Sequence, residues 1–162
     1  MIARGSTRIL PGDHILFMTE TDKTEEPFRL LGIDEWPAGK VAILGGTRLA
    51  ALTAKTMCEA GIQTFLIDQD ADKVRTIATD NPKVVGICGD PTNPRLLRSE
   101  GIDGVDVVLA LTGWDEINIL GCLVAKAIGV QTAVARFHRM DLVKLLAGVG
   151  IDGGISSRLS AA

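Results

Sequence analysis

The residues with the clearest chemical potential are two adjacent glycines and an aspartate within residues 41–70, VAILGGTRLAALTAKTMCEAGIQTFLIDQD. Gly45 and Gly46 follow one apolar run, and Asp68 ends the next. A glycine turn between a strand and a helix directs backbone N–H groups at a phosphate, and an acid about 20 residues later binds a ribose. The spacing therefore predicts a nucleotide site. An acid at position 68 favours a free 2′-hydroxyl, and so NAD(H) or an adenosine nucleotide over NADP(H).

The glycine series G-x-G-x-x-G/A is incomplete, because Thr47 stands where its second glycine would lie. The Cβ of Thr47 would crowd a phosphate, yet its hydroxyl could donate a hydrogen bond to the same phosphate. Arg48 and Leu49 begin the following helix, and Arg48 could screen a pyrophosphate or extend into solvent. Ala50 suits the last position, whose task is helix packing.

Two further strand ends carry polar residues. Asp90 follows Gly89 and could accept a hydrogen bond from an adenine amino group, or merely start the turn before Pro91. Residues 112–116, TGWDE, could form the far wall of the crevice; alternatively, the two acids complement a helix dipole and the tryptophan covers a packing gap. The predicted ligand-binding set is Gly45, Gly46, Thr47, Arg48, Leu49, Asp68, Gly89, Asp90, Thr112, Gly113 and Asp115.

The elements that would position these residues alternate β-branched runs with helical periods over residues 40–156. We expect strands at 40–44, 63–67, 83–88, 105–111, 132–136 and 151–155, and helices at 48–60, 70–79, 93–100, 115–128 and 141–149. Right-handed crossovers would join them. The predicted fold is α/β, a Rossmann-like, doubly wound sheet of six parallel strands.

The first 39 residues have a different pattern. Residues 6–10 and 14–19 read as strands around the turn Pro11-Gly12-Asp13, and a polar stretch follows. Because two strands alone are marginally stable, we expect a β-hairpin remnant of another unit. The predicted division is a remnant at 1–32, a linker at 33–39 and a nucleotide-binding domain at 40–162.

Composition limits the classes of function. The chain has 162 residues, a net charge of −3 and a pI near 5.4, which give no chain-wide reason to bind nucleic acid or anionic lipid. No apolar run reaches the length of a membrane span and no signal-peptide core begins the chain, so we expect a cytoplasmic location.

Candidates for metal binding and catalysis are few. Cys58, Cys88 and Cys122 form no CxxC pair and read as structural thiols, and His14 and His138 lack metal-ligand spacing. We predict no metal site. The chain contains no tyrosine for a Tyr–Lys proton relay, and neither histidine has a recognisable acidic partner in the sequence. We therefore predict a module that senses or gates rather than an enzyme.

The chain resembles the RCK or KTN regulatory domains of bacterial potassium-uptake systems of the Trk and Ktr types. The resemblance runs in order through Gly45-Gly46-Thr47-Arg48-Leu49-Ala50, Leu66-Ile67-Asp68-Gln69-Asp70, Gly89-Asp90-Pro91-Thr92, Leu111-Thr112-Gly113, Asp115-Glu116-Ile117-Asn118, Ala135-Arg136, Gly150-Ile151-Asp152 and Ile155-Ser156-Ser157-Arg158. Gly5-Ser6-Thr7 and Pro11-Gly12-Asp13-His14-Ile15-Leu16 are similar to the smaller subdomain that follows such a domain. The chain thus resembles a fragment comprising the tail of one repeat and the nucleotide-binding half of the second.

The resemblance implies a cytoplasmic gating-ring subunit that docks on a potassium-translocating membrane protein, assembles with other RCK domains and binds NAD(H), ATP or ADP. Gly45, Gly46, Arg48 and Asp68 would hold phosphate and ribose, Asp90 would hold the adenine end, and residues 112–115 would form the far wall. Family members more often have glycine at the position of Thr47. The alternatives are a small NAD-dependent oxidoreductase and a nucleotide-free assembly module.

Overall fold

The computed structural model describes residues 8, 10, 38–139, 142 and 146–156. The chain divides into two units, Met1–Pro37 and Ala38–Ala162, and the boundary falls within the segment expected to be a linker. The hairpin predicted at residues 6–10 and 14–19 lies outside the described residues, apart from positions 8 and 10. The fold below is that of the second unit.

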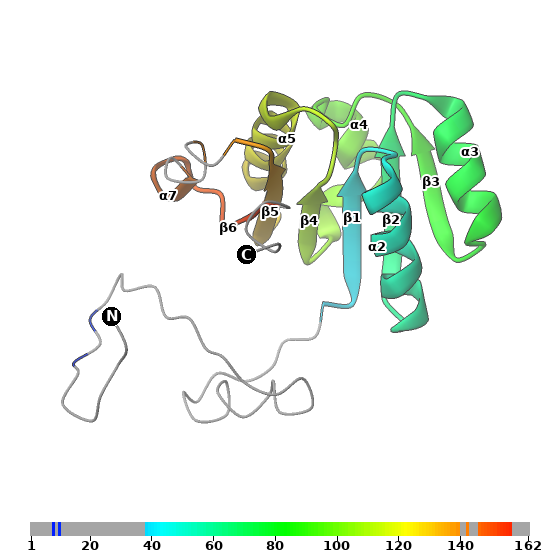
Figure 1. The fold of residues 1–162 in the computed structure, drawn as a ribbon, viewed down its shortest axis with the longest axis horizontal. Helices are drawn as coiled ribbons and strands as arrows, with labels where there is room; N and C mark the ends of the chain where they lie inside the picture. Colours follow the sequence, from blue (N-terminus) through cyan, green and yellow to red (C-terminus); the bar gives the residue numbers. More distant parts are fainter. Residues whose placement is uncertain (1–7, 9, 11–37, 140–141, 143–145, 157–162) are drawn as a thin grey trace. The chain divides into compact units, whose positions relative to one another are not determined.

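Six parallel strands form one sheet in the order β3-β2-β1-β4-β5-β6, which confirms the predicted architecture (Figure 1). The strands are β1 (Lys40–Leu44), β2 (Gln63–Asp68), β3 (Val84–Cys88), β4 (Val107–Ala110), β5 (Thr132–Phe137) and β6 (Gly153–Ser156). The helices are α2 (Arg48–Glu59), α3 (Ala71–Asp80), α4 (Pro94–Ser99), the 3-10 turn η2 (Ile102–Gly104), α5 (Asp115–Ile128) and α7 (Leu146–Val149). No helix of the described part is long and apolar enough to cross a membrane.

Side chains with the expected capping chemistry begin the helices that follow β1, β2 and β3. Thr47 accepts from Ala50 N at α2, Asp70 accepts from Asp72 N and Lys73 N at α3, and Asn93 precedes Pro94 at α4. Because each cap lies a few residues beyond a strand, all three helices start at one edge of the sheet.

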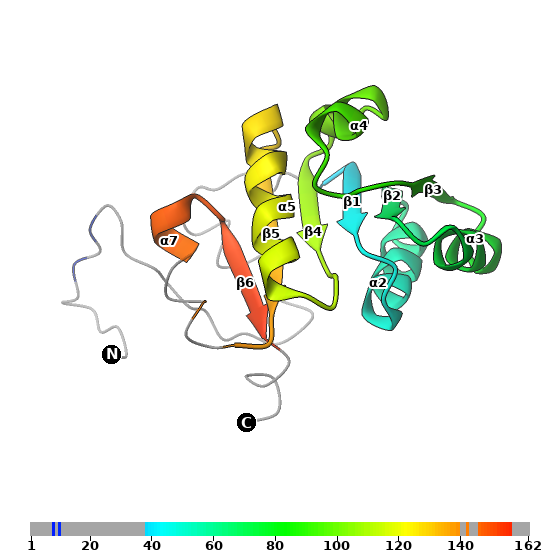
Figure 2. The ribbon, with the colours of Figure 1, turned by 90° about the horizontal axis from the view of Figure 1, so that it is seen from above.

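The helices cover both faces of the sheet: α2 and α3 lie on one side, α4 and α5 on the other (Figure 2). Val41 and Ile43 point into the α2 cluster, while Ala42 and Leu44 point into the α5 cluster, as strand alternation requires. The small residues of α2 that face the sheet, Ala50 and Ala54, are fully buried and allow a close approach. Two apolar layers therefore cover the sheet, one on each face.

The strand order places the switch point between β1 and β4, which pair in register from Val41↔Val107 to Leu44↔Ala110. The chain continues from β1 to β2 on one side of this point and from β4 to β5 on the other. Because these two connections diverge, a crevice opens beyond the carboxyl ends of β1 and β4. Asp68 pairs with Cys88 at the end of β2 and β3. The residues after β1, β2, β3 and β4 thus meet at one edge.

The observed strands match the predicted bounds to within one residue at each end, except that β4 and β6 each begin two residues later than predicted. The strand expected at 105–111 is shorter, because Val105 N still bonds to Ile102 O in a turn and the Asp106 carboxylate accepts from the backbone N–H groups of Gly39 and Lys40. The last strand begins at Gly153 rather than residue 151, after Asp152 has used its carboxylate to bind Ala133 N at 2.8 Å. Polar side chains at the opposite edge of the sheet therefore set these two starts.

Candidate functional site

The glycine turn after β1 packs closely against the ends of β2 and β4. Gly45 has a φ of +105°, and a Cβ there would lie 2.8 Å from both Cα and Cγ2 of Thr112. Its N–H donates to Ile67 O at 2.7 Å. Gly45 is therefore required by backbone conformation and by close approach to the loop after β4.

Asp68 holds this turn from the end of β2. Its Oδ2 accepts from Gly46 N at 2.5 Å, and its Oδ1 accepts from Asp70 N at 2.8 Å. The side chain is half-buried and lines the cleft described below. Since each carboxylate oxygen can accept two hydrogen bonds, acceptor capacity remains for a ribose hydroxyl.

Thr47 uses its hydroxyl inside the protein. Its Oγ1 accepts from Ala50 N at 3.2 Å as the α2 cap and donates its proton to Leu111 O at 2.8 Å. In this arrangement the proton is not directed at a phosphate, which was one of the two roles considered for this residue. The N–H groups of Arg48 and Leu49 stay without intrahelical partners by helix geometry. They are the donors that α2 can offer to an anion.

Asp90 starts the turn before Pro91, as one of its two interpretations expects, and its side chain also lines the cleft. Its Oδ1 accepts from the Thr92 hydroxyl at 2.7 Å and from Thr92 N at 2.8 Å. These bonds from Thr92 hold the pKa of Asp90 below its usual value. The side chain is therefore an ionised acceptor at neutral pH.

A buried amide fixes the rim formed by the loop after β4. Asn118 is fully buried; its Oδ1 accepts from Thr112 N at 2.9 Å and from the Thr112 hydroxyl at 2.7 Å. Its Nδ2 donates to Arg136 O at 2.9 Å and to Thr112 O at 3.3 Å. This side chain links the ends of β4 and β5. Sequence reasoning gave it no role, although a polar residue on the inward face of α5 was a usable signal.

These elements enclose a cleft of about 350 Å³ at the switch point. The predicted residues that line it are Thr47, Asp68, Asp90, Thr112 and Gly113. Gly46 and Arg48, again with Thr47, line an adjoining groove of about 380 Å³ between α2 and α3. Gly45, Leu49, Gly89 and Asp115 line neither hollow.

The cleft also contains residues outside the predicted set, namely Gln69, Lys73, Pro91, Trp114 and Ile117. Lys73 borders both hollows, with its Nζ 3.4 Å from Asp70 Oδ2. Trp114 was considered as cover for a packing gap, but it is 71% exposed. Both residues follow a strand end closely, which is the signal that could have placed them.

Asp115 turns away from the cleft. Its Oδ1 lies 2.9 Å from both N and Nδ1 of His138, and its Oδ2 accepts from Arg139 N at 3.0 Å. Burial raises the pKa of Asp115, but the hydrogen bonds from His138 and Arg139 outweigh it and leave the pKa lowered. The expectation that neither histidine has an acidic partner is wrong for His138. The pair forms because β4 and β5 are neighbours, a contact across 23 residues.

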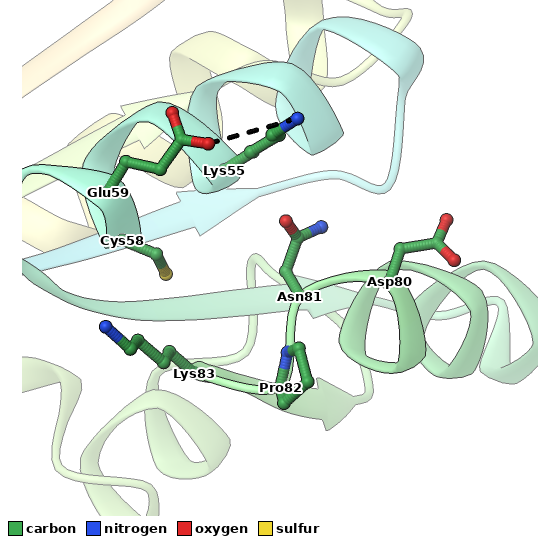
Figure 3. A pocket seen from close by; sticks show the side chains of 7 residues that line it. All are labelled: Lys55, Cys58, Glu59, Asp80, Asn81, Pro82 and Lys83. Carbon is green, nitrogen blue, oxygen red and sulfur yellow. Dashed lines mark ion pairs between the residues drawn. The ribbon is translucent and has the colours of Figure 1, made fainter.

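A third hollow, of about 270 Å³, lies at the far ends of α2 and α3 (Figure 3). Lys55 and Glu59 pair across one helical turn at 3.9 Å, and the Cys58 thiol is almost covered. Because α2 begins at the glycine turn, this hollow is at the opposite edge from the cleft. No group of three potential metal ligands occurs among the described residues.

The cysteines fall into two environments. Cys58 and Cys122 are buried, and burial raises the pKa of the Cys122 thiol to about 12, as expected for an inert structural residue. Cys88 is exposed at the end of β3, with its Sγ 3.6 Å from Gln69 O. All three cysteines were interpreted as structural thiols, and the exposure of Cys88 does not fit that interpretation.

Known proteins share this fold and sequence. The TrkA-N domain family matches residues 41–157. The Trk system potassium uptake protein TrkA of Haemophilus influenzae is 33% identical over 153 residues, which are 94% of this chain and 33% of that protein. A TrkA homolog of Archaeoglobus fulgidus is 31% identical over 158 residues, 97% of this chain and 36% of that protein. The chain thus spans about a third of the length of these relatives.

Solved structures of related proteins show the same fold. The GsuK RCK domain is 27% identical with a TM-score of 0.62, covering 76% of this chain and 26% of that one. GsuK bound to ADP is 27% identical with a TM-score of 0.62, covering 79% of this chain and 33% of that one. From its sequence and its six-stranded sheet, this chain belongs to the TrkA-N domain family.

Proposed function

We propose that the chain is a nucleotide-binding regulatory domain of a potassium-uptake system, with NAD(H), ADP or ATP as its non-covalent ligand. The observation that carries the proposal is the cleft at the switch point of a TrkA-N domain, where a glycine turn, a helix N-terminus and the carboxylates of Asp68 and Asp90 converge. GsuK, a structural neighbour, has been crystallised with ADP. The relatives named for potassium uptake support the wider role.

Each residue has a definite task in this proposal. The free lone pairs of Asp68 accept from ribose hydroxyls, and the ionised Asp90 accepts from the adenine amino group. Arg48 and the first-turn N–H groups of α2 face the phosphates, where the helix dipole also favours an anion. Thr112 and Gly113 form the opposite wall.

The domain would act by shifting an equilibrium rather than by catalysis. A ligand changes the relative population of two arrangements only if it binds them with different affinity. We propose that these arrangements are orientations of packed RCK domains, attached on the cytoplasmic side to a potassium-translocating membrane subunit. The Asp115–His138 pair is not part of the cleft lining, so it is not positioned to transfer a proton to a ligand held there.

A specific observation favours a second candidate, an assembly module that binds no nucleotide. Gly46 N is already bonded to Asp68, and Ala50 N is already bonded to Thr47. Two donors that the turn could offer to a phosphate are therefore satisfied by the protein itself.

Thermal unfolding in the presence of NADH, NAD, ATP, ADP, AMP and NADPH separates the two candidates. A ligand at 100 times its Kd stabilises a domain by about 2.7 kcal/mol, which raises the Tm by several degrees. The proposal expects such a shift with at least one adenine nucleotide and its loss in Asp68→Ala. Unchanged melting curves with all six ligands would reject nucleotide sensing and favour the assembly module.

A further inference from the structure

We propose that Trp114 is the stacking platform for the adenine ring of the ligand. This inference rests on the proposed nucleotide site and adds to it a residue that contacts the base. The indole is 71% exposed at the rim of the cleft, beside Ile117, which is 36% exposed. A large apolar ring exposed beside a cleft gains stability when a planar ligand covers it.

The occupant of this surface follows from the polar groups of the same cleft. Asp90 and Asp68 line it together with Trp114, so one ligand must offer hydrogen-bond donors and an apolar face at once. A purine carrying an amino group and a ribose meets both requirements. Aromatic side chains bind nucleobases in this way because every base has a π-face.

The backbone of Trp114 is held in place, so stacking requires little further ordering. Its N–H donates to the Thr112 hydroxyl oxygen at 3.2 Å, and its carbonyl accepts from Asn118 N at 3.0 Å. Thr112 and Asn118 are themselves buried and mutually bonded. Only the two side-chain torsions of the indole remain to be fixed by the ligand, which keeps the entropic cost low.

The phosphate end of the site has few free hydrogen-bond donors, so contacts with the base should contribute more to the affinity of the ligand. Gly46 N and Ala50 N are already occupied by Asp68 and Thr47, which leaves α2 fewer donors for phosphate. A larger share of the affinity then comes from the adenosine half. We expect adenosine, AMP and ADP to depend equally on Trp114, because the indole contacts only the part that they share.

The chain contains two tryptophans, Trp36 and Trp114, so Trp36→Phe leaves Trp114 as the only indole. In the full chain carrying this substitution, adenosine, AMP, ADP and NADH should each quench the fluorescence, whereas ribose 5-phosphate, which lacks a base, should not. Calorimetric titration of Trp114→Ala should show binding of adenosine and ADP weakened by about 5- to 150-fold. Trp114→Phe should restore most of the affinity.

Leu120→Ala is the matched control, because Leu120 is a 46% exposed apolar residue of α5 outside the cleft. It should leave every affinity unchanged. Equal binding by Trp114→Ala and the unsubstituted chain, or no quenching of Trp114 by adenine ligands that bind, would overturn the stacking role alone. Failure of the unsubstituted chain to bind any adenine ligand would overturn the proposed function and this inference together.

Discussion

Replacing Asn118 with aspartate tests whether one buried amide holds the rim of the cleft. In Asn118→Asp the oxygen that accepts from Thr112 is kept, but the Nδ2 group that donates to Thr112 O and Arg136 O is lost. A buried carbonyl left without a donor costs about 1–3 kcal/mol. The free energy of unfolding should therefore fall by about 2–6 kcal/mol near neutral pH, a large part of the 5–15 kcal/mol typical of a domain.

The loss should depend on pH in a defined direction. Burial beside two carbonyl oxygens raises the folded-state pKa of the introduced carboxyl above its unfolded-state value. The folded state then binds the proton more tightly, so the penalty is greatest near neutral pH and shrinks as the pH falls through the folded-state pKa. Protonation also restores one donor to the site.

Urea unfolding followed by circular dichroism, near neutral pH and in mild acid, measures both effects against the unsubstituted chain. Asn93→Asp is the control, because the Asn93 Oδ1 only accepts from Arg95 N and Leu96 N, a capping role that aspartate performs equally well. If Asn118→Asp were as stable as this control near neutral pH, or lost more stability in acid, the role assigned to the amide would be refuted.

Three other substitutions test separate parts of the site. Gly45→Ala should lower the free energy of unfolding by about 2–4 kcal/mol, since it combines a strained φ with steric overlap, whereas Gly113→Ala, which has open space around it, should be nearly neutral by urea unfolding. Thr47→Gly should cost about 1 kcal/mol through loss of the hydroxyl bond to Leu111 O, and a stability gain on the same assay would contradict that bond's role. The folded-state pKa of Asp115 is lowered, so its contribution to stability is present above its unfolded-state pKa and is lost as the pH falls through the folded-state pKa. The stability difference between the unsubstituted chain and Asp115→Asn should therefore shrink over that acid range, and a constant difference would contradict it.

Much of the fold follows from local patterns. The apolar run that forms β1 ends just before Gly45, and the run that forms β2 ends at Asp68. Parallel strands bring such ends to one edge, so the position of the crevice was predictable. The capping residues Asp70 and Asn93 also fixed two helix starts to within a residue.

The partners of individual side chains were not predictable in the same way. Whether the Thr47 hydroxyl meets a phosphate or Leu111 O depends on how close β1 and β4 approach, which no local pattern encodes. The Asp115–His138 contact likewise depends on which strands are neighbours and on where β5 ends. The assignment of residues 1–32 to a preceding subdomain stays a prediction.

The contact between Gly45 and Thr112 bears on how the domain would signal under the proposed function. A Cβ at position 45 would overlap Thr112, and the Thr47 hydroxyl is bonded to Leu111 O, so the β1–α2 turn and the β4–α5 loop form a single rigid block. Under the proposed function, a ligand would therefore meet a preformed cleft and spend little of its binding free energy on closing it. The remaining binding free energy could then shift elements outside this block, and α5 connects to them because Asp115 binds the backbone of His138 and Arg139.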